Sequence, residues 1–313
     1  MYIGSHAKLD SDLVKGANIP FRPILTGKFR RYFSWRNFVD PFFVLIGLLQ
    51  SLFILLSFRP QVVFSKGGYV SVPVVLAAFI LRRPVILHES DSRMGLANRF
   101  CAGISKRVCV AFPILAKKGS KFVLTGNPIR ESILNGDKEK GFRLTGFKQG
   151  APVVLVWGGS QGAQQINEII QAEFHELKRY FQIVHITGVG KSVGLQDENY
   201  KAFEYLGDDL KHIYAITDFV VGRAGANSLY ELAVMGKPNI VIPLANADQQ
   251  LNAEYFIDQG ASIPFEKNNR LSDLLLALWH NPEKQAEMKE ALRSVAKPKA
   301  AREIADIILN VVT

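Results

Sequence analysis

The chain has 313 residues, 48% of them hydrophobic and 21% charged, which fits a folded globular protein of about two domains. Its net charge of +10 predicts an acidic partner; because zinc-ligand spacing, helix-turn-helix and ribonucleoprotein-type aromatic patterns are all lacking, we expect anionic lipid and no nucleic acid. Two cysteines indicate a reducing compartment, and the first residues do not resemble a signal peptide.

A long apolar stretch, PFFVLIGLLQSLFILLSF, occupies residues 41–58. Lys28, Arg30, Arg31 and Arg36 precede it, with aromatic residues between them. Three structures fit this pattern: a helix lying on an anionic membrane, a core helix buried on both faces, and a membrane-spanning helix. The flanking basic and aromatic residues favour the first, although the stretch is slightly short for a span.

Strand-like and helix-like segments alternate along the whole chain, which is typical of parallel α/β domains. In the first half we expect strands at 61–65, 84–88, 107–111 and 121–125, and helices near 42–58, 70–82 and 93–105. In the second half we expect strands at 153–157, 182–187, 218–222 and 239–243, and helices near 163–180, 226–235, 248–259, 282–296 and 299–312.

The polar, glycine-punctuated segment 135–150 separates these halves. We therefore expect one domain over residues 1–147 and a second over 148–298, with the last helix, 299–313, packing back on the first domain. Two doubly wound domains place ligands at the carboxyl ends of their strands, where the candidate motifs also fall.

The most informative of these motifs is WGGSQGAQQINEII, residues 157–170. An apolar run precedes it and an amphipathic helix follows, so its glycines lie at a strand-to-helix turn. Glycines let a ligand approach the backbone there, and the N-terminus of the helix favours an anion. A tight turn without a ligand fits the same residues.

Three further turns could contribute to a ligand site. SKGGYVSVP, residues 65–73, is a second glycine turn, and TGNPIR, residues 125–130, puts Arg130 where its guanidinium could pair with phosphate. GRAGANSLYE, residues 222–231, puts Glu231 one turn into a helix, where it could bind a ribose or merely complement the helix dipole.

Two other patterns fail as chemical motifs. HITGVGKS, residues 185–192, ends like a phosphate-binding loop but has His185 where the first glycine is required. The acidic pair in LDSDL, residues 9–13, precedes no matching strand end, so a solvated turn is the better interpretation. Because the sequence contains no cluster of histidine, cysteine and carboxylate residues, we expect neither a metal nor another cofactor.

The motifs GGYVSVP, HES with GLANRF, GNPIR, GGSQGA, GRAGANSLYEL and ADQQLNA occur here in the order of the MurG family, which the chain resembles from about residue 2 to its end. That family transfers N-acetylglucosamine from its UDP donor to lipid-linked N-acetylmuramyl-pentapeptide. The resemblance implies the α/β GT-B fold, with two Rossmann-like domains facing a cleft. It also implies peripheral attachment to the cytoplasmic face of the bacterial inner membrane, beside other wall-synthesis proteins.

The same resemblance implies residue roles. Glu231 would bind the ribose hydroxyls, the segment at Leu206 would read uracil, and Gln249 or Gln250 would contact the sugar. The acceptor side would hold Tyr69, His88 and Glu89. The full set of substrate-binding residues implied is Asn98, Arg130, Ser160, Gln161, Gly162, Leu206, Gly207, Ala226, Asn227, Ser228, Leu229, Tyr230, Glu231, Gln249 and Gln250.

The sequence also departs from the family pattern. The family opens with a strand and a Gly-Gly-Thr-Gly-Gly-His loop that supplies a proposed general base, whereas Met1 begins at what resembles the second strand. Asp91 replaces a usual asparagine. We therefore expect an incomplete first domain, with no catalytic base identified. A UDP-sugar transferase acting on another membrane lipid, and a non-catalytic sugar-nucleotide-binding or scaffold subunit, remain as alternatives.

Overall fold

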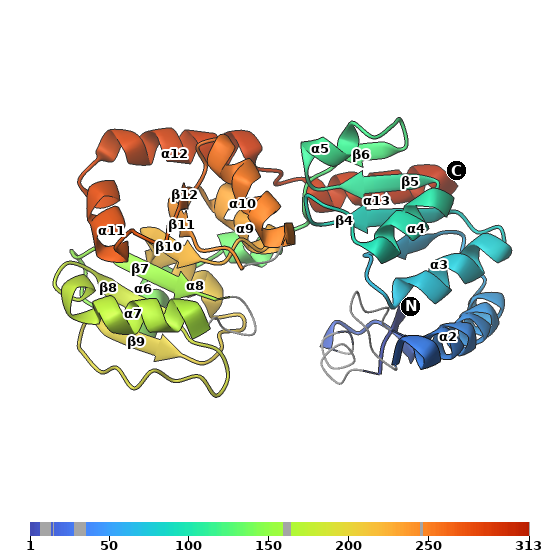
Figure 1. Cartoon of the computed structure of the whole chain (residues 1–313), viewed down its shortest axis with the longest axis horizontal. Coiled ribbons are helices and arrows are strands. Elements are labelled where there is room, and N and C mark those ends of the chain that lie inside the picture. Colours follow the sequence, from blue (N-terminus) through green and yellow to red (C-terminus); the bar gives the residue numbers. More distant parts are fainter. Residues whose placement is uncertain (7–13, 15, 28–35, 159–163, 245–246, 313) are drawn as a thin grey trace. The chain divides into compact units, whose positions relative to one another are not determined.

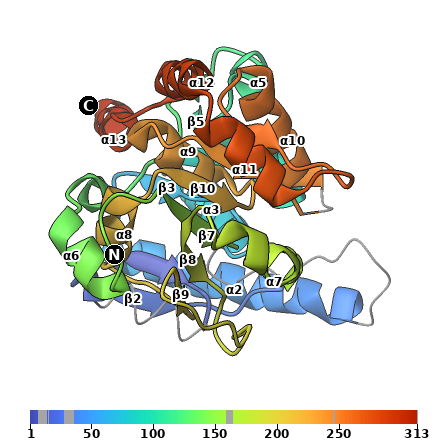
Figure 2. The same cartoon turned by 90° about the vertical axis from the view of Figure 1, so that its left-hand side faces the viewer.

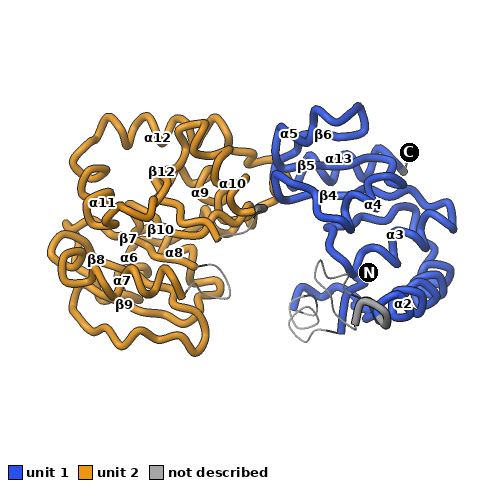
Figure 3. The backbone as a smooth tube through the Cα atoms, viewed as in Figure 1, with its two compact units in different colours: residues 1–126, 301–313 blue, residues 127–300 orange. Residues whose placement is uncertain are grey.

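The structure, a computed structural model, describes residues 1–6, 14, 16–27, 36–158, 164–244 and 247–312. Contacts within the chain divide it into two compact units, residues 1–126 with 301–313 and residues 127–300 (Figure 3). Each unit contains a parallel sheet covered by helices, as the alternating pattern predicts (Figure 1). This division follows Gly126, whereas the sequence places the domain boundary after residue 147.

The main sheet of the first unit has four parallel strands in the order β3-β4-β5-β6. Their bounds are Val63–Ser65, Val85–Glu89, Arg107–Val110 and Phe122–Leu124. Two further strands, β1 (Tyr2–Gly4) and β2 (Phe21–Pro23), pair in parallel as a separate sheet. Ile3 of β1 and Val63 of β3 pack against the same hydrophobic cluster, so both sheets share one core.

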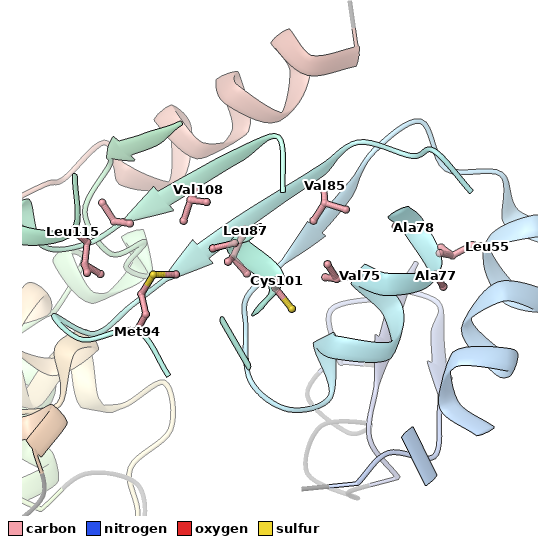
Figure 4. Close-up of a cluster of buried hydrophobic side chains, with 12 residues drawn as sticks. Leu55, Val75, Ala77, Ala78, Val85, Leu87, Met94, Cys101, Val108 and Leu115 are labelled. Carbon is pink, nitrogen blue, oxygen red and sulfur yellow. The ribbon is translucent and has the colours of Figure 1, made fainter. Parts of the chain in front are cut away.

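That cluster covers one face of the main sheet (Figure 4). Alternate residues of β4 and β5 supply it, including Leu87 and Val108, because side chains alternate between the two faces of a strand. The helices that close over it are α2 (Arg36–Phe58), α3 (Ser71–Ile80), α4 (Leu96–Ile104) and α5 (Pro113–Ala116). In Figure 4 Leu55 of α2 lies beside Ala77 and Ala78 of α3.

The opposite face of the same sheet is covered by the last helix, α13 (Ala300–Val312). Ile86 of β4 and Cys109 of β5 point to that face and form a cluster with Ile304, and Ile307 and Ile308 pack against it. A segment from the end of the chain thus completes the core of the first unit.

The second unit has a six-stranded parallel sheet in the order β12-β11-β10-β7-β8-β9. The bounds of β7 to β12 are Val153–Trp157, Gln182–Ile186, Tyr200–Phe203, Phe219–Gly222, Asn239–Val241 and Ile263–Pro264. Strand order reverses between β7 and β10, which are adjacent. In open α/β sheets such a reversal opens a crevice at the carboxyl ends of the two strands, where ligands bind.

Helices cover both faces of this sheet, with α7 on one side and α6 and α8 on the other (Figure 2). The helices α6 to α12 span Lys138–Thr145, Gln164–Leu177, Leu210–Ile216, Ala226–Met235, Ala247–Asp258, Leu271–Trp279 and Pro282–Val295. Residues 131–134 form a 3-10 turn, η1 (Glu131–Leu134). The Asp137 N–H donates to Nδ1 of His212, which ties the start of α6 to α8 within this unit.

Helix α2 is unusual because its exposed face is its apolar one. Only 17% of the window Asp40–Phe58 is buried, although by length and composition that helix could cross a membrane. Phe53 is 76% exposed and Phe42 68%, whereas Gly47 and Ser51 face inward. The interpretation of 41–58 as a core helix buried on both faces is therefore wrong, because α2 packs inward along one stripe, which contains Gly47, Ser51 and Leu55.

Candidate functional site

The glycine turn after β7 lies only partly within the structure. Ser160, Gln161 and Gly162 fall in residues 159–163, outside the described residues, so their predicted contacts stay predictions. Its two flanks, Trp157 at the end of β7 and Gln164 at the start of α7, are described. They place the turn at the carboxyl edge of the sheet, beside the reversal of strand order.

The turn between β10 and α9 lies at the same edge, because β10 pairs in parallel with β7. Helix α9 begins at Ala226 after Gly225, which offers no side-chain cap, and its first turn contains no acidic residue. Leu229 N–H donates to the Gly225 carbonyl, which leaves Ala226, Asn227 and Ser228 as the first turn. An uncapped helix N-terminus carries partial positive charge, so this turn suits an anion.

Glu231 follows one turn later and is only 8% exposed. Burial raises the pKa of its carboxyl group, and the nearby charge of Arg130 and a hydrogen bond from the Tyr214 hydroxyl partly offset that rise. Arg130 and Glu231 are 101 residues apart in the sequence. Both belong to the second unit, and the fold brings their charges near each other. A carboxylate near an arginine at a strand edge can accept hydrogen bonds from hydroxyl groups.

Tyr214 is a residue that the sequence analysis missed. Its ring is 1% exposed and packs edge-to-face against Trp157, with the ring centroids 6.3 Å apart. Its hydroxyl lies 3.5 Å from Oε2 of Glu231. No motif marks this tyrosine, because it lies inside the short helix α8, and only the packing of α8 against β7 brings it to Glu231.

The remaining residues predicted to bind the UDP-sugar lie in the loop between β9 and α8 and in the first turns of α9 and α10. Leu206 and Gly207 lie between β9 and α8, where Leu206 packs against the core and Gly207 accepts a hydrogen bond from Leu210 N–H. Gln249 and Gln250 lie in the first turn of α10, and Oε1 of Gln249 accepts from Leu244 N–H at 3.1 Å. Leu229 and Tyr230 are buried and face the core, so their side chains help to hold α9 in place.

The first unit has its own polar cluster at the carboxyl ends of β3 and β4. His88 is fully buried, and its Nε2 lies 3.0 Å from the Gly126 carbonyl, so Nε2 carries the proton. Its Nδ1 then accepts from the Lys66 ammonium at 2.9 Å, and Lys66 also donates to Oγ of Ser90. Burial lowers the pKa of His88 to about 4, so the imidazole is neutral near pH 7.

Lys66 is a second residue that the sequence analysis missed. The residue as a whole is exposed, but its bond to His88 is partly buried. Burial of the ammonium group lowers the pKa of Lys66 to about 8, against the opposing charges of Glu89 and Asp91. The motif SKGGYVSVP contains this lysine, and its position between a strand end and two glycines is the signal that could have identified it.

Glu89 and Asn98 extend this cluster toward the glycine turn. Asn98 donates to Oε2 of Glu89 at 2.8 Å and accepts from Gly68 N–H at 3.2 Å. Gly67 and Gly68 both have positive φ, and a Cβ on Gly67 would collide with the Asn98 side chain. The turn therefore requires glycine and is clamped by Asn98, while Tyr69, at 39% exposed, stands outside it.

Among the residues that the structure describes, no group of three histidine, cysteine or carboxylate side chains could hold a metal ion. The polar groups at both strand edges are instead amides, hydroxyls, arginine and lysine side chains, a buried histidine and carboxylates. Such groups bind hydroxyls and oxyanions by hydrogen bonds.

The chain is similar to known glycosyltransferases along most of its length. Residues 1–110 match the glycosyltransferase family 28 N-terminal domain, and residues 153–306 match the C-terminal domain of the same family. The chain is 41% identical over 312 residues to a Bacillus anthracis protein, covering 94% of this chain and 89% of that one. That protein is named UDP-N-acetylglucosamine–N-acetylmuramyl-(pentapeptide) pyrophosphoryl-undecaprenol N-acetylglucosamine transferase 2. A Legionella pneumophila transferase of the same name, without the number, is 39% identical, covering 98% of this chain and 87% of its own.

Solved structures show the same architecture. The crystal structure of Acinetobacter baumannii MurG matches with a TM-score of 0.74 and 25% identity, over 98% of this chain and 90% of that one. A Neisseria meningitidis UDP-GlcNAc 2-epimerase bound to UDP-GlcNAc matches with a TM-score of 0.71 over the same shares, but at 15% identity it shows the fold alone. The predicted α/β fold of GT-B type, with two Rossmann-like domains, is confirmed.

Proposed function

The chain belongs to the MurG group of glycosyltransferase family 28, and we propose that it transfers N-acetylglucosamine from UDP-N-acetylglucosamine to lipid-linked N-acetylmuramyl-pentapeptide in peptidoglycan synthesis. The observation that carries this proposal is the 41% identity, over 94% of the chain, to a relative named for that reaction. Similarity of this extent covers most of both units.

The proposed reaction is a direct displacement. The 4-hydroxyl oxygen of the muramyl sugar forms a bond to the anomeric carbon as the bond from that carbon to the UDP oxygen breaks. The hydroxyl proton passes to a base, and UDP leaves with the bonding electron pair, so configuration at the anomeric carbon inverts. The protein then has two tasks, which are to orient both substrates and to stabilise the charge that develops on the diphosphate.

The second unit binds the donor in this proposal. Glu231 accepts hydrogen bonds from the ribose hydroxyls, and the uncapped start of α9 faces the diphosphate. Arg130 and Ser160 add donors, the Leu206–Gly207 backbone reads uracil, and Gln249 or Gln250 contacts the sugar. The packing of Tyr214 against Trp157 holds the Glu231 carboxylate from behind.

The first unit binds the lipid-linked acceptor. Tyr69, His88 and Glu89 line that side in our proposal, next to the glycine turn that Asn98 clamps. Since the His88 imidazole is neutral, with its proton on Nε2, it orients Lys66 through Nδ1. Lys66, with its lowered pKa, is the acceptor-side group best suited to exchange a proton near neutral pH.

We also place the protein on the cytoplasmic face of the bacterial inner membrane, where a lipid-linked acceptor is accessible. Helix α3 packs on α2, and at its end Phe79 and Ile80 are also exposed, at 54% and 52%. Arg59, Arg82 and Arg83 flank this surface. Lys28, Arg30 and Arg31 lie outside the described residues, as does the side chain of Arg36. Apolar side chains bordered by basic ones suit an anionic bilayer, and other wall-synthesis proteins could share it.

The experiment is a transfer assay with radiolabelled UDP-N-acetylglucosamine and a lipid-linked muramyl-pentapeptide. We expect labelled disaccharide lipid and an equimolar amount of UDP. The same lipid without its muramyl-peptide serves as the control acceptor and should stay unlabelled. UDP binding without transfer would support the non-catalytic alternative, and labelling of the control lipid would support a transferase of different acceptor specificity.

A further inference from the structure

Arg223 lies at the point where the strand order of the second unit reverses. It follows β10 directly and precedes the start of α9 by three residues. Its Nη1 atom donates to three oxygens: Oε1 of Gln165 at 2.9 Å, the Ile242 carbonyl at 2.9 Å and the Pro243 carbonyl at 3.3 Å. One end of the guanidinium thus joins the start of α7 to the loop after β11.

The guanidinium is a buried charge with only neutral partners. Arg223 is 9% exposed, and its three acceptors are an amide oxygen and two backbone carbonyls. Within the described ranges no carboxylate forms an ion pair with it, and burial lowers its pKa without an opposing acidic charge. Burying a charge costs free energy unless an opposite charge pairs with it. The cation of Arg223 is buried without such a side chain, so its counter-charge must come from elsewhere.

The other end of the guanidinium retains donor capacity. Nε is buried and has no hydrogen-bond partner, which is rare for a buried donor and calls for an explanation. The hydrogen bonds that the structure gives to Arg223 all come from Nη1. Nε and Nη2 form the fork with which arginine binds two oxygens of one oxyanion.

The surroundings of Arg223 favour an anion as well. The start of α9 is uncapped, has no acidic residue in its first turn, and presents the partial positive charge of a helix N-terminus. Asn252 of α10 donates to the Ala224 carbonyl at 3.3 Å and is fully buried, so the segment between Arg223 and α9 is held rigidly.

We propose that Arg223 is a substrate-binding residue whose Nε–Nη2 edge pairs with the diphosphate of the UDP-sugar and stabilises the UDP leaving group as its bond to the sugar breaks. This inference rests on the proposed function. The charge that grows on the leaving oxygen supplies the counter-charge that the buried guanidinium otherwise lacks. The interaction therefore strengthens as the bond breaks, which is the condition for lowering the barrier.

A purely structural role for Arg223 makes a different prediction. If the side chain only joined α7 to the loop after β11, its loss would lower the affinity of the second unit for every ligand by the same factor. If it pairs with the diphosphate, its loss weakens the binding of UDP but leaves the binding of uridine unchanged, because uridine has no phosphate. The ratio of the two dissociation constants separates the two roles.

The experiment compares UDP and uridine binding to the full chain and to Arg223→Gln, Arg223→Lys and Arg293→Gln. Arg293 is an exposed arginine on α12 that pairs with Glu290, so its variant is the matched control. We expect Arg223→Gln to reduce the preference for UDP over uridine roughly 10- to 100-fold, the effect of losing hydrogen bonds to a charged group. The preference for UDP over uridine in Arg223→Lys should lie between those of the unmodified chain and Arg223→Gln, because a lysine keeps the charge but not the two-donor edge of the guanidinium.

A measurement on the unmodified chain guards against variants that fail to fold. The ¹⁵Nε–¹H resonance of Arg223, identified by its loss in the Arg223→Lys spectrum or by specific labelling, should shift with UDP and stay in place with uridine. An unchanged preference for UDP in Arg223→Gln, or a resonance indifferent to UDP, would overturn the proposal for Arg223 while leaving the donor site intact. Absence of UDP binding to the unmodified chain would overturn both this inference and the proposed function.

Discussion

At the residue scale, three charged groups of the two units form hydrogen bonds with neutral partners. Glu231 is backed by a tyrosine hydroxyl, Lys66 by a neutral imidazole and a serine, and Arg223 by carbonyls. Partners of this kind fix the position of a charge without neutralising it, because they offer dipoles and no opposite charge. The charge then stays available for a ligand, which is the pre-organisation that binding and catalysis require.

The clearest prediction at this scale concerns Glu231. Glu231→Gln should weaken UDP binding by roughly 1–3 kcal/mol, the usual contribution of hydrogen bonds to a charged group. Because the pKa of Glu231 is raised, its carboxylate becomes protonated in the unmodified protein as pH falls through that raised value. This protonation should weaken the binding of UDP. The substituted protein should lose this pH dependence. Calorimetric titration at several pH values measures both effects.

The control for this titration is Glu290→Gln, because Glu290 is exposed on α12 and pairs with Arg293. It should bind UDP as the unmodified protein does at every pH. An affinity for UDP that does not change in Glu231→Gln would remove this carboxylate from the donor site.

At the scale of elements, α2 shows how a helix can be folded and yet present an apolar face. Its inward stripe contains Gly47 and Ser51, whose small size lets α2 approach its neighbours closely, and Leu55 anchors it on α3. Its outward face contains large side chains at helical spacing, including Leu49 and Phe53. An exposed apolar surface of this extent marks an interaction site more often than an ordinary surface.

We predict that the double substitution Leu49→Ser and Phe53→Ser reduces binding to phosphatidylglycerol vesicles by about tenfold or more. Both side chains are exposed, at 59% and 76%, so folding should be little affected, whereas their insertion into a bilayer buries apolar area. Added salt should remove the electrostatic part of the binding and leave the apolar part. Sedimentation with vesicles at low and high ionic strength measures both.

Ile114→Ser supplies the comparison, since Ile114 is 65% exposed on α5 of the same unit. It should sediment like the unmodified protein. Equal binding to phosphatidylcholine vesicles would argue against the role of charge, and full binding by the double variant would argue against α2 as the contact.

At the scale of the whole molecule, each unit contains a histidine that is fully buried and neutral. His88 lies in the first unit and His185 in the second, where His185 Nε2 lies 3.0 Å from Oδ1 of Asn167 and Nδ1 lies 2.9 Å from the Tyr200 hydroxyl. Burial lowers the pKa of each to about 4, from an ordinary value of 6.5. Acid should therefore weaken both units.

We predict that the melting temperature falls between pH 6.5 and pH 4. Above pH 6.5 both histidines are neutral whether the chain is folded or not, so their full contribution to stability is present. Below pH 6.5 these histidines bind protons in the unfolded chain but not in the folded one. This difference lowers the free energy of unfolding by about 3 kcal/mol for each histidine by pH 4. The raised pKa values of Glu89 and Glu231 offset part of this loss. Calorimetry across this range measures the slope.

His175→Gln is the matched control, because His175 is exposed on α7 and its removal should leave the slope unchanged. His185→Gln should lower the melting temperature at pH 7, where it breaks the bonds to Asn167 and Tyr200, and should flatten the slope. A melting temperature constant from pH 6.5 to 4.5 would contradict the neutral, buried state of both histidines.

The sequence by itself determined the alternation of strands and helices and the position of the main turns. Apolar β-branched runs and helical spacing are local properties, so β7, α7, β10 and α9 begin within a few residues of their predicted positions. The short elements β9, α8 and α11 escaped prediction, because a strand or helix of four to nine residues is stabilised mainly by what it packs against.

Only the tertiary structure decided which residues meet. Arg130 reaches Glu231 because η1 packs on α8, Lys66 reaches His88 because β3 pairs with β4, and no spacing in the chain encodes either meeting. The structure likewise decided that α2 presents its apolar side outward, since the apolar sequence of 41–58 left a buried core helix open as an alternative. Local patterns follow from backbone geometry and are written in short stretches of sequence, whereas burial and the meeting of charges depend on how distant segments pack.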